Sequence, residues 1–240
     1  MHELAYNTNI MVERIKTNKA DSIKTLETLV DWTREVSQPV QGLLVPVSGG
    51  TDSALAFWVC TQARPGEVLG VHTDNEPLRG REWFESKGKL EIVETPGLEA
   101  EIEEMRWARF LNMNIVKDYG LVGSRTRTED LMGTYSHASR VATYQPLINT
   151  WKSDVIKLCK ELGVPTDIIA SSYEADCNCG RPERMSCIPF EARDDFLRSE
   201  VLGEEGIDLS DMPEEDQKYL KGVVVYNAFK RDLPFRGPAA

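Results

Sequence analysis

The residues best suited to chemistry form the segment Ser48-Gly49-Gly50-Thr51-Asp52-Ser53, which directly follows an apolar run from Leu43 to Val47. A short, continuous apolar run is typical of a buried parallel strand. Adjacent glycines let the backbone approach a ligand closely, and the N–H groups at the start of a following helix favour an anion. The segment therefore predicts a phosphate-binding loop between a strand and a helix.

The carboxylate of Asp52 narrows the chemistry of this loop. It would repel a bare phosphate, but it could hold Mg²⁺ against the phosphate oxygens. The chain lacks both G-x-x-x-x-G-K-[ST] and G-x-G-x-x-G here, which excludes the P-loop and the dinucleotide fingerprint. The alternative is a tight turn followed by a helix N-cap, a pairing that is common in α/β proteins.

Strand and helix patterns alternate around the loop. Short apolar runs predict strands at 43–47, 68–71, 90–93 and 121–123. Apolar spacing and end signals predict helices at 22–37, 52–62, 98–119, 126–135 and 151–162, with Gly120 as a left-handed cap of the third. This alternation predicts an α/β fold, a doubly wound parallel sheet with helices on both faces.

Length and composition fit a single domain across residues 1–240. With 41% hydrophobic residues, the chain can bury a sizeable core. Residues 171–188 are rich in Ser, Cys, Asn, Gly and Pro without a clear period, so we expect a loop that could cover a site. Residues 189–240 are expected to form a C-terminal helical extension of the domain.

The charge balance and the lack of long apolar runs argue against nucleic acid and membranes as partners. Asp and Glu number 39 against 28 Lys and Arg, a net charge of -11 that would repel a phosphate backbone. No apolar run reaches the length of a membrane span, and Met1 to Tyr6 lack the order of a signal peptide. We therefore expect a soluble cytoplasmic protein that binds neither nucleic acid nor a membrane.

Three of the five cysteines, Cys177, Cys179 and Cys187, lie inside the predicted loop, within a span of eleven residues. An odd total argues against a disulfide framework. The C-x-C-x7-C spacing could hold zinc if a fourth ligand joined, or a [4Fe-4S] cluster with one open iron. Asp176, His72, His137 and Cys159 are candidates for the fourth zinc ligand. Three unconnected, reduced thiols are the remaining alternative.

Several motifs resemble known families. The hexapeptide S-G-G-x-D-S after an apolar run resembles the signature of the ATP pyrophosphatases, which adenylate a carbonyl group and let a nitrogen or sulfur nucleophile displace AMP. Further segments resemble NAD synthetases over most of the chain outside 72–100, and imply an adenine nucleotide alpha hydrolase-like fold. These segments are Leu121–Tyr135, Pro146-Leu147, Trp151–Val155, Leu162–Pro165, Ala175-Asp176, Asp195–Leu197 and Lys230–Pro234.

The resemblance implies roles for individual residues. Ser48 to Ser53 would bind the ATP phosphates, with Ser124 and Lys152 also contacting the nucleotide, while Asp52 and Glu129 would bind Mg²⁺. These roles make physical sense, because two carboxylates at one sheet edge can share Mg²⁺ and a lysine can stabilise charge on departing pyrophosphate. The alternatives are a first-turn helix charge for Glu129 and a solvated surface position for Lys152.

The acceptor side departs from the resembled pattern. Arg106 resembles the arginine of the family's R-M motif, His137 stands near the position of an acceptor-binding lysine, and Lys230 falls in the C-terminal basic motif. These three are the candidate acceptor-binding residues. However, the family's Lys-x-G-D-G-x-x-D stretch is replaced by residues 136–144, which contain no acidic residue. The part of the family pattern that would bind ATP is present in this sequence, whereas the part that would recognise deamido-NAD is replaced by other residues.

The resemblance implies an ammonia-dependent NAD synthetase, a ligase that adenylates a small-molecule carboxylate acceptor and forms an amide. Ammonia would come free or from a partner amidase. The likeness also implies a homodimer, formed through helices 22–37 and 98–119. The alternatives are a sulfur transferase or amide ligase acting on another acceptor, and a nucleotide-binding module without catalysis. Retention of Asp52 and Glu129 speaks against the last.

Overall fold

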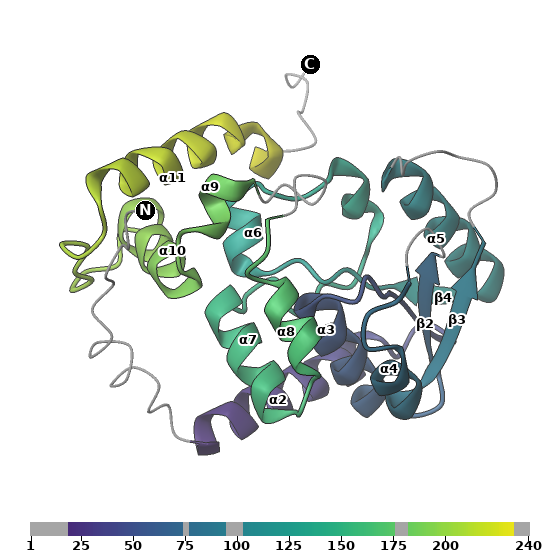
Figure 1. The fold of residues 1–240 in the computed structure, drawn as a ribbon. Helices are drawn as coiled ribbons and strands as arrows, with labels where there is room; N and C mark the ends of the chain where they lie inside the picture. The colour runs from purple at the N-terminus through teal and green to yellow at the C-terminus, as the bar shows by residue number, and fades with distance from the viewer. Residues whose placement is uncertain (1–18, 74–76, 95–102, 176–181, 233–240) are drawn as a thin grey trace.

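The computed structural model describes residues 19–73, 77–94, 103–175 and 182–232. Its centre is a sheet of four parallel strands in the order β3-β2-β1-β4 (Figure 1). The strands are β1 (Gly42–Pro46), β2 (Val68–Thr73), β3 (Lys89–Val93) and β4 (Tyr119–Leu121). The first strand thus lies inside the sheet, which positions the loop that follows it at the carboxyl edge, between neighbouring strand ends.

Helices cover both faces of the sheet, as the alternating pattern predicted. Leu43 and Val45 of β1 point into a core shared with one group of helices, whereas Leu44 points into a second core on the opposite face. The first group comprises α2 (Lys19–Val36), α3 (Thr51–Ala63), α4 (Arg81–Lys87), α7 (Lys152–Glu161) and α8 (Thr166–Ser171); the second face carries α5 (Glu103–Lys117) and η1 (His137–Val141). The doubly wound α/β fold is therefore confirmed.

A third core lies among the C-terminal helices, on the side of the molecule away from the sheet (Figure 1). There Met132 and Trp151 pack with Met185, Phe196 and Leu220. The helices involved are α6 (Arg127–Met132), α9 (Glu183–Ser186), α10 (Phe190–Phe196), η2 (Leu197–Val201) and α11 (Glu214–Tyr226), followed by η3 (Ala228–Asp232). The C-terminal segment thus packs against α6 and the start of α7, although its status as an extension of one domain stays a prediction.

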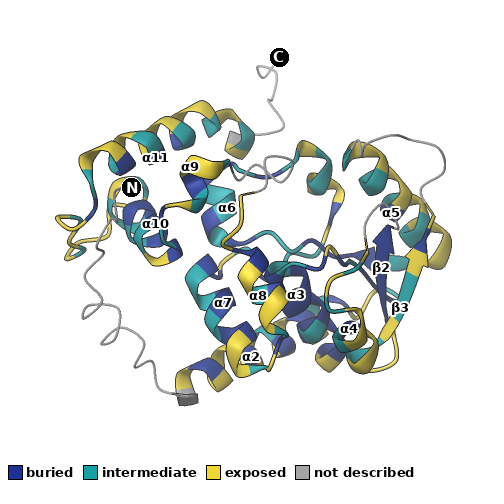
Figure 2. Ribbon diagram, viewed as in Figure 1, coloured by how far each residue is buried: buried dark blue, intermediate teal, exposed yellow. Residues whose placement is uncertain are grey.

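Burial follows the layers of the fold (Figure 2). Strand β2 is buried along its whole length, and β3 at the edge of the sheet is mostly half-buried or exposed. Helix α3 is buried nearly all round, which explains its continuous apolar sequence. Among the described residues, no helix is long and apolar enough to span a membrane.

Two predicted helix ends are wrong. Gly120 does not cap the helix at 98–119, because it lies in β4 paired with Leu43, and Asp118 takes the left-handed conformation instead, at φ 55°. A Cβ on Gly120 would lie 2.3 Å from the Tyr144 ring, so close packing explains this glycine. The helix predicted at 126–135 ends at Met132, because Gly133 adopts φ 67°.

The segment 171–188 is not wholly a loop. It contains the end of α8 and the short helix α9, which Pro182 precedes. Met185 of α9 is buried in the C-terminal core, and this tertiary contact favours a helical turn that the local sequence did not indicate. Strand β4 also ends earlier than predicted, at Leu121, with Val122 making an isolated bridge to Tyr144.

Candidate active site

The predicted phosphate loop connects β1 to α3 at the carboxyl edge of the sheet. Gly49 has φ 79°, which favours glycine, and the Ser48 N–H donates to Ser53 Oγ at 3.2 Å while that hydroxyl donates to the Gly50 carbonyl at 3.0 Å. Gly50 is the N-cap of α3 and supplies no side-chain cap. The first turn of this 13-residue helix can therefore direct its N–H groups toward an anion.

Lys152 reaches the loop from the first turn of α7. Its side chain is buried, with the residue 6% exposed, and its Nζ donates to both carboxylate oxygens of Asp52 at 2.6 Å and to Thr51 Oγ1 at 2.9 Å. Residues a hundred positions apart in sequence thus meet at the start of α3. The alternative of a solvated surface lysine is wrong.

Glu129 lies in the first turn of α6, where it caps the helix and lies close enough to Asp52 to interact with its charge. Its Oε2 accepts from the Thr126 N–H at 3.0 Å and the Thr126 hydroxyl at 3.1 Å, which completes a capping box. Burial raises the pKa of the Glu129 carboxyl, and the negative charge of Asp52 raises it further, against the lowering effect of Lys152 and Thr126. Glu129 is therefore a helix cap whose carboxyl group also lies within the electrostatic reach of Asp52.

A cavity of about 730 Å³ opens at these residues, a volume suited to small-molecule ligands. Its lining includes Ser48 to Asp52 together with Ser124, Glu129 and Lys152, so the structure brings the predicted nucleotide residues to one place. Ser53 is not in the lining and instead forms hydrogen bonds within the loop.

The three predicted acceptor residues have different positions. Arg106 lines the cavity. Lys230 lines it too, but its Nζ donates to the carbonyls of Gly133 and Tyr135 at 2.8 and 2.9 Å. Burial and the nearby charge of Arg125 lower the Lys230 pKa. His137 is outside the lining and stacks on Phe229 with ring centroids 5.6 Å apart.

Sequence reasoning missed Arg125 as a residue of this cavity. Its guanidinium lies over the Tyr135 ring, 3.6 Å from the centroid, and its Nη1 pairs with Asp130 at 3.1 Å. The side chain is 11% exposed and lines the cavity, as Arg106 and Lys230 do. The available signal was its place just after a strand end, where parallel strands present functional side chains.

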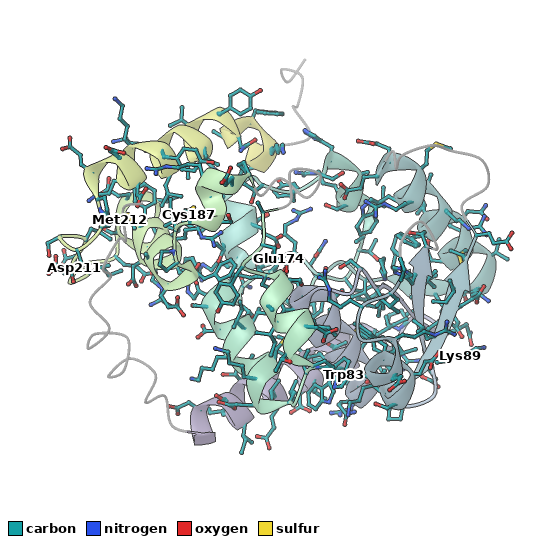
Figure 3. The ribbon with its side chains drawn as sticks, in the orientation of Figure 1. Trp83, Lys89, Glu174, Cys187, Asp211 and Met212 are labelled. Carbon is teal, nitrogen blue, oxygen red and sulfur yellow. The ribbon has the colours of Figure 1, made fainter. Side chains whose placement is uncertain are left out.

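Arg79 was also missed, in the part of the chain without family resemblance. It lines the cavity, and its backbone and Cβ pack against Gly49, where an added Cβ would come within 3.3 Å of them. Its guanidinium lies 3.8 Å from Glu174, another lining residue, which Figure 3 labels near the centre of the molecule.

The cysteine cluster is only partly within the described residues. Cys177 and Cys179 lie outside them. Cys187 is exposed and not in a disulfide, at the end of α9, and Figure 3 shows it among the C-terminal helices, apart from Glu174. Within the described ranges, no three His, Cys, Asp or Glu side chains form a metal-binding group. The structure thus gives no support to a zinc or iron-sulfur site, which stays a prediction.

Comparison with known proteins identifies the family of this chain. The family model for NAD synthase matches residues 105–234. The chain is 28% identical over 169 residues to the NH(3)-dependent NAD(+) synthetase of Methanoregula boonei, covering 60% of this chain and 68% of that relative. It is 24% identical over 249 residues to the one of Thermococcus sibiricus, covering 91% and 98%.

Solved structures share the fold. An NH3-dependent NAD synthetase from Campylobacter jejuni, in complex with the nitrate ion, aligns with a TM-score of 0.70 at 19% identity, over 90% of this chain and 99% of that one. An NMN synthetase from Francisella tularensis aligns with a TM-score of 0.71 at 16% identity, over 91% and 99%. Since the family model spans more than half of the chain, this protein belongs to the NAD synthase family, ATP-dependent ligases that form a carbon–nitrogen bond.

Proposed function

We propose that the protein is an ammonia-dependent NAD synthetase, which adenylates the carboxylate of deamido-NAD with ATP and lets ammonia displace AMP to leave the amide. The observation that carries this proposal is the convergence of the buried Lys152 ammonium on Asp52, at the phosphate loop and beside Glu129. The names of the relatives in Methanoregula and Thermococcus support the same reaction. They do not favour sulfur transfer or a module without catalysis.

On the ATP side, each residue has a simple task. The N–H groups at the start of α3 bind phosphate oxygens, and Gly49 and Gly50 let them approach. The Lys152 ammonium, already held at this point, neutralises charge that develops on the departing pyrophosphate. Ser124 lines the same cavity and contacts the nucleotide.

The donor set at the loop fits Mg²⁺. Asp52 and Glu129 supply hard oxygen ligands, and the charge of Asp52 raises the Glu129 pKa, a repulsion that a divalent cation would relieve. When bound, Mg²⁺ would neutralise phosphate charge and polarise the phosphoryl group under attack. Lys152 now pairs with Asp52, so it must share or leave that carboxylate when the metal binds.

The acceptor binds at the cationic side chains of the cavity, Arg106, Arg125 and Lys230. A second candidate is a smaller acceptor, a pyridine carboxylate mononucleotide, with NMN as the product. It is favoured by two features of this chain: the Lys-x-G-D-G-x-x-D stretch is replaced, and His137 packs on Phe229 outside the cavity. The fold is compatible with it, because an NMN synthetase shares that fold.

We further propose a source of ammonia, an oligomeric state and a cellular location for the enzyme. Ammonia is supplied free or by a partner amidase. The enzyme acts as a homodimer through α2 and α5, and it works in the cytoplasm, where ATP is abundant.

The reaction is tested by pyrophosphate release from Mg-ATP with ammonium and either deamido-NAD or nicotinate mononucleotide. We expect release and amide formation with deamido-NAD; faster turnover of the mononucleotide would favour the second candidate. Release with neither would reject both. Asp52→Asn should lower kcat by roughly a hundredfold, the scale for losing a group that stabilises transition-state charge. The matched control is Asp167→Asn, because Asp167 is an exposed carboxylate on α8.

A further inference from the structure

Asp194 is a buried carboxylate on α10 that does not line the cavity. The residue is 3% exposed. Its Oδ1 accepts from the Thr128 hydroxyl at 2.5 Å, and its Oδ2 accepts from the Ser153 N–H at 3.0 Å. One side chain therefore joins the first turns of two helices, α6 and α7, which are separate segments of the chain.

The same two turns are fastened to each other directly. The Thr128 hydroxyl that donates to Asp194 also accepts from the Lys152 N–H at 2.9 Å. The Arg127 N–H donates to the Thr150 carbonyl at 2.9 Å. Asp194 thus completes a buried network in which the hydroxyl and one carboxylate satisfy N–H groups that a helix start leaves unpaired.

The network lies next to two of the groups that serve ATP, Glu129 and Lys152. Thr128 precedes Glu129, and Ser153 follows Lys152. Turning either helix about its axis would move the Glu129 carboxylate or the Lys152 ammonium away from Asp52. Phe190, also on α10, lies under the same ammonium, with its ring centroid 5.6 Å from Lys152 Nζ. Helix α10 therefore reaches the site at two points.

From this geometry we propose that Asp194 is a positioning residue: it fixes α6 and α7 relative to each other, so that Glu129 and Lys152 meet at the phosphate loop. This role rests on the proposed function only in that Glu129 and Lys152 serve Mg-ATP. Through Asp194, the C-terminal helices become part of the catalytic framework and not only a stabilising layer.

A carboxylate is the residue type that this position requires. Burying an ionised group costs free energy unless the group is well hydrogen-bonded. The Asp194 carboxylate meets this condition because it accepts hydrogen bonds from two different donors at once. An asparagine of the same shape has one acceptor oxygen and can satisfy only one of the two, and alanine satisfies neither. The order of damage should therefore be Asp194→Ala worse than Asp194→Asn.

The experiment measures Mg-ATP binding by calorimetry and steady-state kinetics of pyrophosphate release. For Asp194→Ala we expect kcat to fall by about a hundredfold, as for a roughly 1 Å misplacement of catalytic groups. Mg-ATP affinity should fall at least tenfold, and the KM for the acceptor should change less than threefold. Asp194→Asn should recover part of both losses. Thr128→Val should resemble Asp194→Ala, and the double variant should be no worse than either single one.

Asp216→Asn is the matched control. Asp216 is also a buried aspartate of the C-terminal helices, but it pairs with Arg184 of α9 at 2.6 Å. The Asp216→Asn substitution should lower the melting temperature, while kcat and Mg-ATP affinity stay within twofold of the wild-type values. Equal kinetic losses in Asp216→Asn and Asp194→Ala at equal loss of stability would overturn the proposal, as would an unchanged kcat and affinity in Asp194→Ala.

Two further outcomes separate this proposal from the proposed function. Calorimetry needs no acceptor, so a wild-type protein that binds Mg-ATP but makes no amide rejects the proposed function and still tests Asp194 through affinity. A wild-type protein that does not bind Mg-ATP rejects both. If Asp194→Ala fails to fold, Thr128→Val carries the test, because valine matches threonine in shape and lacks the hydroxyl.

Discussion

Two carboxyl groups near the site, Glu129 and Asp194, have pKa values raised mainly by burial. For Asp194 the pKa rises from 3.8 to about 6, against the lowering effects of Ser153, Thr128 and Arg193. A raised pKa means that the folded protein holds a proton that the unfolded chain has already lost. The ionised group therefore costs stability as the pH rises through this window, although the site uses that same ionised form at neutral pH.

The pH dependence of unfolding tests this cost. Relative to Asp194→Asn, the free energy of unfolding of the wild-type protein should fall as the pH rises, by about 3 kcal/mol in total and by about 2 kcal/mol between pH 4 and pH 6, since each pKa unit corresponds to about 1.4 kcal/mol. Denaturant titrations at several pH values measure it. Glu129 titrates in both proteins and cancels in the comparison. A difference that does not vary with pH would contradict the raised pKa.

At the scale of elements, α6 is short, and its position depends on its ends. Thr126 and Glu129 cap its start, and Gly133 ends it in the left-handed conformation. Gly133 packs so closely against the end of α11 that an added Cβ would lie 2.4 Å from Asn227 Cβ. Two features therefore favour glycine at position 133: its left-handed backbone conformation and its close contact with α11. Gly163, just after the end of α7, has the same φ of 67°, but a Cβ added there would have no atom within 4 Å.

The two glycines form a matched pair of variants. Gly163→Ala should cost about 1 to 2 kcal/mol, the penalty of a left-handed non-glycine residue. Gly133→Ala should cost about 1 to 3 kcal/mol more, the range for overpacking, because alanine would also collide with Asn227. Unfolding by denaturant at neutral pH measures both. Equal losses in the two variants would mean that α11 can move away from α6 at little cost.

For the molecule as a whole, the helices predicted to form the dimer each carry exposed apolar side chains. On α5, Ile115 is 68% and Val116 77% exposed, and α2 exposes Ile23 and Trp32. Scattered exposed apolar residues are normal on a monomer, so exposure alone decides nothing. Their occurrence on both helices is nevertheless what an interface between two copies would need.

The dimer is tested by substituting one of these side chains with a charge. Wild-type protein should sediment as a dimer, and Val116→Glu should shift it toward monomer, because a buried, unpaired carboxylate opposes association. Val225→Glu is the control: Val225 on α11 is 67% exposed but lies outside the predicted interface. Analytical ultracentrifugation at several concentrations distinguishes the outcomes. A monomeric wild type, or a Val116→Glu protein that stays dimeric, would contradict this interface.

The class of fold and the position of the phosphate loop could be predicted from the amino-acid sequence alone. The apolar runs and helical spacings around Leu43 to Val47 are local patterns, and local patterns follow from backbone geometry alone. For the same reason the glycines of Ser48 to Ser53 indicated the phosphate loop before any contact was known. Roles for Glu129 and Lys152 came from family resemblance, since nothing local distinguishes them from ordinary helix charges.

Which side chains contact one another depends on the folded arrangement and could not be predicted from local sequence. The pairing of Lys152 with Asp52, the network of Asp194, and the position of Arg125 over Tyr135 join residues whose local sequences carry no sign of one another. Packing likewise overrode local signals at Gly120, which lies in a strand against Tyr144, and at Met185, whose burial favours a helical turn in the expected loop. The physical reason is that burial and long-range hydrogen bonds depend on the assembled fold, whereas period and turn chemistry depend on neighbours in the chain.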